Sequence, residues 1–208
     1  MSLQRETWQQ AWKNKSFRIQ FLLTLAFLGC IGIFIPHFFE FIQQRNGKVL
    51  NDPLLRLLAP KDFSLLTFIL IYSGMIVSLA GLLSYPELLL RTIQAYCLLT
   101  LMRIACISLV PLNEPPGMIL LSDPFVGVIG YGGKVITKDL FFSGHTSTLT
   151  LLILSVSQKW LKIVLCCITI TVASLILIQH VHYMIDVLAA PLFAAISWWI
   201  CFRKLALL

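Results

Sequence analysis

The chain has 208 residues, of which 58% are hydrophobic and only 12% are charged, and its formal net charge is +7 at pH 7. A soluble domain carries about 25% charged residues, so this chain has about half of what a water-exposed surface requires. The composition excludes a soluble enzyme, a disordered tail and a nucleic-acid-binding module, and it predicts an integral membrane protein.

Residues 1–18 predict a short helix that lies at the membrane surface. Trp8 and Trp12 are four residues apart, and basic residues follow them. This pattern is typical of a helix with its aromatic side in the membrane and its basic side toward lipid headgroups. The apolar stretch that follows has no small-residue cleavage site, so we expect a retained anchor that ends near Pro36 and His37.

Six apolar stretches predict six membrane spans, because about 20 apolar residues cross the hydrocarbon core. The expected spans are residues 19–39, 63–83, 88–112, 140–156, 161–178 and 186–202. The fourth span is the shortest and the most polar. With short connections these spans fill the chain, so the sequence predicts one all-α membrane domain over residues 1–208, a polytopic six-helix bundle.

The distribution of Lys and Arg predicts that both termini are cytoplasmic, because cytoplasmic connections carry the excess of basic residues. Nine basic residues fall on the side of the termini and six on the opposite side, where the connections are longer. The polar motifs described next then face away from the cytoplasm.

The start of the fourth expected span, within residues 139–146, contains Ser143, Gly144 and His145. A helix N-terminus binds anions through its free N–H groups and the positive end of its dipole. Gly144 has no Cβ and lets an anion approach the backbone, and His145 can give a proton to a leaving oxygen. The alternative is an ordinary polar helix start with a hydrogen-bonded histidine.

His182 and Asp186 stand four residues apart, a spacing that places both side chains on one face of a helix. A carboxylate bound to one ring nitrogen fixes the tautomer and leaves the other nitrogen as a nucleophile or base. The alternative is a pair that only closes a helix junction. His180 has Met184 four residues later in place of an acid, so we predict no part for it in the chemistry.

Arg103 places a charge late in the third expected span, about 12 Å before Pro111. Arginine binds phosphate oxygens through two parallel hydrogen bonds. The alternative is a structural ion pair with Asp186 or Asp139.

Lys134, Lys138 and Asp139 are further candidates for the phosphate site. Lys134 follows a glycine-rich stretch within the connection 113–138. This stretch is not a P-loop, because Val follows the lysine in place of Ser or Thr. This apolar connection is expected to lie at the membrane interface, where it could cover a substrate.

In their order, these motifs resemble the type-2 phosphatidic acid phosphatase (PAP2) superfamily, and within it the sphingomyelin synthase branch. Residues 139–150 (DLFFSGHTSTLT) and 182–189 (HYMIDVLA) are similar to the two histidine motifs of that branch, and residues 103–112 (RIACISLVPL) resemble its arginine motif. The resemblance covers about residues 50–202. It implies a six-helix bundle, phospholipid substrates and no metal or other cofactor.

The resemblance also implies roles for the site residues. His182 would attack the phosphorus, Asp186 would orient it, and His145 would protonate the leaving alcohol. The phosphohistidine would then react with water or with a lipid hydroxyl, such as that of a diacylglycerol-like or ceramide-like acceptor. The expected phosphate ligands are Arg103, Ser143 and Gly144.

Two cationic positions of the wider family are missing, because Tyr96 and Ile176 stand there. A phosphomonoester carries nearly two negative charges near neutral pH, which one arginine offsets poorly, so the sequence favours a phosphodiester lipid. Three functions stay open: a lipid phosphotransferase or phosphodiesterase, a lipid phosphatase acting on phosphatidic acid or a related monoester, and a non-enzymatic membrane protein. The expected location is a bacterial inner membrane, or a Golgi or plasma membrane in a eukaryote, and the sequence predicts no oligomeric state.

Overall fold

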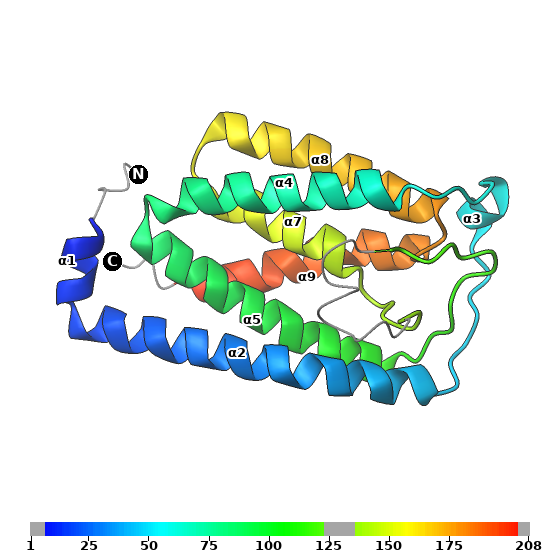
Figure 1. Cartoon of the computed structure of the whole chain (residues 1–208), viewed down its shortest axis with the longest axis horizontal. Helices are drawn as coiled ribbons and strands as arrows, with labels where there is room; N and C mark the ends of the chain where they lie inside the picture. Colours follow the sequence, from blue (N-terminus) through cyan, green and yellow to red (C-terminus); the bar gives the residue numbers. More distant parts are fainter. Residues whose placement is uncertain (1–6, 123–135, 204–208) are drawn as a thin grey trace.

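The computed structural model describes residues 7–122 and 136–203, and in these residues every regular element is a helix. The all-α prediction is confirmed (Figure 1). The elements are α1 (Trp8–Lys13), α2 (Lys15–Gln44), α3 (Pro53–Leu57), α4 (Ser64–Leu83), α5 (Pro86–Leu109), α7 (Gly144–Ser155), α8 (Lys159–Ile178) and α9 (Met184–Phe202).

Five of the described helices are long and apolar enough to cross a membrane, namely α2, α4, α5, α8 and α9. Their mean hydropathy is between 1.5 and 2.6 over the most apolar window. Large hydrophobic side chains are exposed on them, including Leu23, Ile33 and Ile170. Since water would not tolerate such a surface, the chain is an integral membrane protein.

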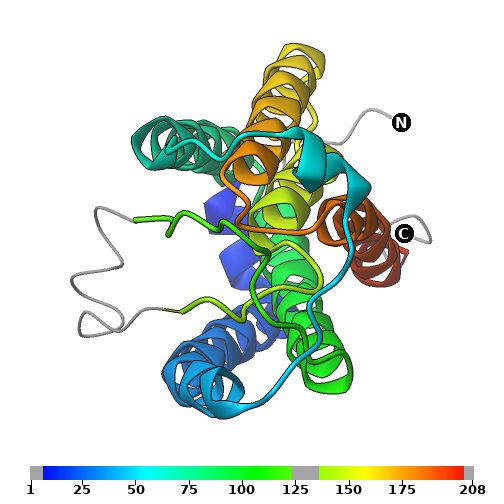
Figure 2. The same cartoon turned by 90° about the vertical axis from the view of Figure 1, so that its right-hand side faces the viewer.

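The predicted count of six spans is not confirmed, because the expected fourth span, residues 140–156, contains only the 12-residue helix α7. Such a helix is about 18 Å long, and the hydrocarbon core is about 30 Å thick. Helix α7 lies at the centre of the bundle and packs against α4, α5, α8 and α9 (Figure 2). Its many hydroxyl side chains therefore face protein rather than lipid.

Helix α2 has 30 residues and differs from the expected span 19–39 at both ends. Asn14 caps its N-terminus, since its Oδ1 accepts the N–H of Ser16 at 2.9 Å. His37, expected at the end of the span, does not end the helix, which continues through Pro36 to Gln44. Proline removes one backbone hydrogen bond, and the packing of the following turns against α5 holds the helix together. The side chains in this packing are Phe38, Phe39, Ile42 and Ile107.

The surface helix predicted within residues 1–18 is present as α1, but its aromatic side contacts the protein. Trp8 and Trp12 both lie edge-on to Phe17 and Phe21 of α2. Trp8 Nε1 also donates to the carbonyl of Leu83 at 2.7 Å. Helix α1 is thus fixed to the end of the bundle where α4 turns into α5.

Helices α4, α5, α8 and α9 agree with the expected spans to within a few residues, and α3 corresponds to none of them. In Figure 1, α1 and the C-terminal end of α9 lie at the left end of the bundle. The described connections with the polar motifs lie at the right end, which we call the loop end. They are residues 45–63, 110–122, 136–143 and 179–183. That the end with the termini is cytoplasmic stays a prediction.

The connections at the loop end are held by buried polar contacts. The Tyr183 hydroxyl donates to the carbonyl of Asn113 at 2.9 Å and accepts the N–H of Leu50 at 3.1 Å. Gly47 lies so close to Leu112 that a Cβ at this position would overlap the Leu112 carbonyl group. These contacts join the connection after α2 and the connection after α5 to the start of α9.

Candidate functional site

Ser143 caps the N-terminus of α7, so Ser143, Gly144 and His145 lie at a helix start, as the sequence predicts. The fully buried Ser143 hydroxyl accepts the N–H of Thr146 at 3.4 Å and lies 3.2 Å from the Thr146 hydroxyl. This is an N-cap, which satisfies one of the unpaired N–H groups of the first turn. The structure therefore places the Ser143 hydroxyl on the helix itself.

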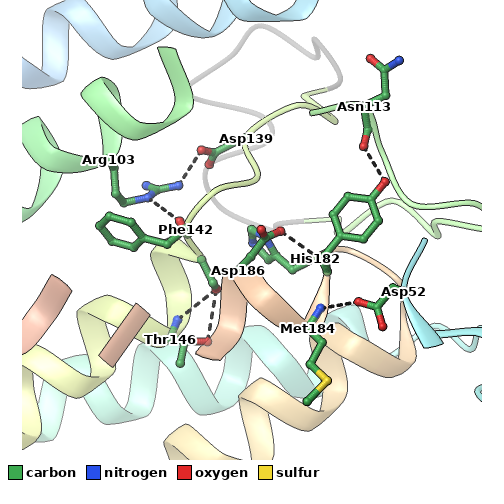
Figure 3. Close-up of polar contacts among 11 residues, drawn as sticks. Asp52, Arg103, Asn113, Asp139, Phe142, Thr146, His182, Met184 and Asp186 are labelled. Carbon is green, nitrogen blue, oxygen red and sulfur yellow. Dashed lines mark hydrogen bonds and ion pairs between the residues drawn. The ribbon is translucent and has the colours of Figure 1, made fainter. Parts of the chain in front are cut away.

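Arg103 lies directly against this helix start. Its Nε donates to the carbonyl of Phe142 at 3.1 Å (Figure 3). A Cβ at Gly144 would lie 2.6 Å from Arg103 Nη1 and 2.7 Å from Cζ, so only glycine leaves room for the guanidinium. A fixed cation and the positive end of the α7 dipole therefore meet at one point, an arrangement that attracts an anion.

The structural partner that the sequence offered as an alternative for Arg103 is also present. Arg103 Nη2 lies 2.5 Å from Asp139 Oδ1 (Figure 3). The alternative partner Asp186 instead faces His182.

His182 and Asp186 form a buried pair, with Nδ1 3.3 Å from Oδ2 and exposed fractions of 2% and 0%. The reason differs from the expected one, because α9 begins at Met184 and His182 precedes the helix. Asp186 lies in the first turn, and its Oδ2 also accepts the N–H of Tyr183 at 3.0 Å. The helix N-terminus thus orients the carboxylate, which in turn orients the imidazole and leaves Nε2 as the second ring nitrogen.

The two histidine motifs lie side by side. The rings of His145 and His182 are 6.5 Å apart between centroids and inclined at 70°. The backbone N–H of Ser143 donates to the backbone carbonyl of Asp186 at 3.0 Å, which fastens the start of α7 to the start of α9. His145 is half-buried and lies edge-on to Phe68.

Lys138 binds elsewhere than at Arg103 or the N-terminus of α7. Its ammonium donates to the carbonyl of Arg45 at the end of α2. Lys134 and half of the predicted covering segment 113–138, namely residues 123–135, lie outside the described residues. Asp139, by contrast, belongs to the site through its contact with Arg103.

His180 contacts the connections of the loop end. Its Nδ1 lies 2.9 Å from the carbonyl of Pro116 and its Nε2 lies 3.1 Å from that of Leu58. Its φ of 58° turns the chain between α8 and α9. Next to it, the fully buried Gln179 donates to Ser64 Oγ at 2.9 Å and accepts the N–H of Phe63 at 3.0 Å.

Asp52 is a site-supporting residue that sequence reasoning missed. Its Oδ1 accepts the N–H of Leu54 at 3.0 Å at the start of α3, and its Oδ2 accepts the N–H of Met184 at 2.7 Å (Figure 3). An Asp before a Pro is a helix-start signal, so α3 could have been predicted. The contact with α9, however, joins residues 132 positions apart and leaves no local signal.

Tyr183 supplies a neutral donor in this region. Burial raises the pKa of the Tyr183 phenol, the hydrogen bond from the N–H of Leu50 opposes this in part, and nearby carboxylates that include Asp186 raise the pKa further. The phenol therefore stays protonated and donates to Asn113 through the neutral pH range.

Over residues 7–122 and 136–203, no group of three or more His, Cys, Asp or Glu side chains forms a metal-binding set.

A comparison with protein families matches residues 138–202 to the family described as PAP2 superfamily C-terminal. The match contains both histidine motifs and Asp186, and Arg103 lies outside it. It supports the PAP2 part of the resemblance and does not distinguish the sphingomyelin synthase branch. No curated protein matches the chain.

Proposed function

We propose that this chain is a membrane enzyme that transfers or releases the headgroup of a phosphodiester lipid through a phosphohistidine. The observation that carries the proposal is the buried His182–Asp186 pair, which lies beside His145 at the loop end of the bundle. The family match supports phosphatase or phosphotransferase chemistry on lipid phosphates.

In the first step, His182 Nε2 attacks the phosphorus, and the bond from phosphorus to the lipid alcohol oxygen breaks. His145 gives a proton to that oxygen, so the alcohol leaves as a neutral group. The Asp186 carboxylate stabilises the charge that forms on the His182 ring. Arg103 and the N-terminus of α7 offset the charge on the phosphate oxygens.

In the second step, an oxygen of water or of a lipid hydroxyl attacks the phosphorus. His145, now neutral, takes its proton, and the nitrogen–phosphorus bond breaks so that its electron pair returns to His182 Nε2. Water releases the headgroup, and a lipid hydroxyl accepts it. The balance between these outcomes depends on whether an acceptor lipid excludes water from the intermediate.

The charges near the phosphate site support a phosphodiester. Among residues 7–122 and 136–203, Arg103 is the arginine or lysine that contacts the α7 N-terminus, Asp139 offsets part of its charge, and Lys138 is bound to the carbonyl of Arg45. A phosphate dianion would need more than one fixed cation. A phosphodiester carries one negative charge, which suits a site with one fixed cation. We therefore favour a sphingomyelin synthase-like transferase that acts on a phospholipid donor and a diacylglycerol-like or ceramide-like acceptor.

A lipid phosphatase is the second candidate, because the family match agrees with it equally well. The two candidates are separated by incubating the purified protein with lipids that carry labelled headgroups, phosphatidic acid among them. We expect faster turnover of a phosphodiester lipid, with the label released or transferred to a second lipid. Faster phosphate release from phosphatidic acid would favour the phosphatase and contradict the proposal.

A further inference from the structure

One guanidinium edge of Arg103 that suits a phosphate is already occupied by groups of the protein. Arginine binds phosphate best through two parallel hydrogen bonds from one edge. The edge formed by Nε and Nη2 is divided between the carbonyl of Phe142 at 3.1 Å and the carboxylate of Asp139 at 2.5 Å. The Asp139 carboxylate therefore lies where a phosphate oxygen would accept from Nη2.

We propose that Asp139 is an internal competitor for the phosphate subsite at Arg103, and that a bound phosphate displaces its carboxylate. This inference rests on the proposed function, because it takes Arg103 as a phosphate ligand. Asp139 then sets the affinity of the site for phosphate groups and restricts it to those that bind strongly enough to replace the carboxylate.

The Asp139 carboxylate is held more loosely than the other two carboxylates near the site. Its side chain is 28% exposed, and among the described residues its hydrogen bonding is to Arg103. Asp186 is fully buried and bound to the N–H of Tyr183, and Asp52 caps two helices. A partly exposed ion pair changes an equilibrium by about fivefold at most, so displacement costs little.

Arg103 keeps its position when the carboxylate leaves. Its Nε remains bound to the carbonyl of Phe142, and its guanidinium lies on Gly144 with no space for a side chain between them. The direction in which phosphate affinity changes therefore distinguishes a competitor from a residue that positions Arg103. Removal of a competitor strengthens phosphate binding, whereas removal of a residue that orients Arg103 weakens it.

The test is calorimetric titration of the purified full chain in detergent micelles with orthophosphate. We expect Asp139→Asn to bind orthophosphate about fivefold more tightly than the wild type. We expect Asp139→Glu to bind like the wild type, because it keeps the charge. Glu114→Gln is the matched control, since it removes a negative charge from an exposed residue at the loop end without touching Arg103, and we expect less than a twofold change.

The added substitution Arg103→Gln should abolish the gain in the Asp139→Asn background. Unchanged or weaker binding by Asp139→Asn, or a gain that persists without Arg103, would overturn the inference. If Asp139→Asn shows no thermal unfolding transition and is therefore not folded, Asp139→Ser is used for the same comparison. A second arm measures KM for a phosphodiester lipid, which should fall by the same factor if the ligand is a lipid headgroup rather than free phosphate alone. Because orthophosphate binding needs no turnover, an inactive chain that shows the expected shift would refute the proposed function and leave this inference standing.

Discussion

His182 owes its orientation to its place just before a helix. Because α9 begins at Met184, the Asp186 carboxylate reaches back to the N–H of Tyr183 and to His182 Nδ1 in one geometry. The sequence predicted this pair from a spacing of four, and the pair is present. It did not predict the helix start that makes the pair, because His-x-x-x-Asp reads equally well as two residues on one helical face.

The first residue-scale prediction concerns the proposed catalytic groups. We expect His145→Ala, His182→Ala and Asp186→Asn each to lower turnover on the order of a thousandfold or more, since each removes one part of a single unit. Turnover of a headgroup-labelled lipid by purified, monodisperse protein checks this. His37→Ala is the matched control, because His37 is exposed on α2. Near-normal turnover by the His182 variant would reassign the nucleophile.

The second prediction separates His180 from His182. The sequence predicted no chemical role for His180, and the structure adds a structural role, because both ring nitrogens lie on backbone carbonyls. We expect His180→Ala to lower the free energy of unfolding by about 1–3 kcal/mol, the cost of leaving buried polar groups unsatisfied. Thermal unfolding in detergent measures the loss. Activity per folded molecule should persist, and its disappearance in a fully folded variant would contradict this assignment.

At the scale of elements, the sequence predicted long apolar helices well and exceptions poorly. The ends of α4, α5, α8 and α9 follow from apolar runs bounded by polar residues. Two features, the proline inside α2 and the length of α7, needed tertiary information. Pro36 is tolerated inside α2 because Phe38 and Phe39 pack against Ile107. Helix α7 is short because Ser143 caps it at its start and Val156 is extended at its end.

The element-scale prediction concerns Tyr183, which joins two connections to α9. Tyr183→Phe removes the donor to Asn113 and the acceptor for Leu50. We expect it to lower the free energy of unfolding by about 1–3 kcal/mol. Tyr96→Phe is the control, because Tyr96 is 37% exposed on α5. Equal melting temperatures for the two variants would show that Tyr183 does not hold the loop end together.

At the scale of the whole molecule, the arrangement separates the chain ends from the proposed chemistry. Helix α1 and the end of α9 lie at one end of the bundle, and the starts of α7 and α9, beside which the two histidines lie, are directed toward the other (Figure 1). The basic residues predict that the first of these ends is cytoplasmic. The proposed site then faces away from the cytoplasm and acts on lipid headgroups of the non-cytoplasmic leaflet.

Single cysteines in a cysteine-free background test this orientation. Glu114, in the connection after α5, and Ser157, in the connection between α7 and α8, are both exposed. These two connections lie at opposite ends of the bundle (Figure 1). We expect an impermeant thiol reagent to label Glu114→Cys in intact cells, and to label Ser157→Cys only after the membrane is opened. The reverse pattern would invert the topology and place the proposed site in the cytoplasm.

The central claim is that His182 carries the phosphorus during the reaction. The most direct measurement is a quench experiment, in which the reconstituted protein is mixed with a phosphodiester lipid whose phosphorus is radiolabelled, stopped in alkali and mapped by peptide analysis. We predict an acid-labile label on the peptide that contains His182, and no label in His182→Ala. Steady turnover with the label on another residue, or with no protein-bound label at all, would contradict the account.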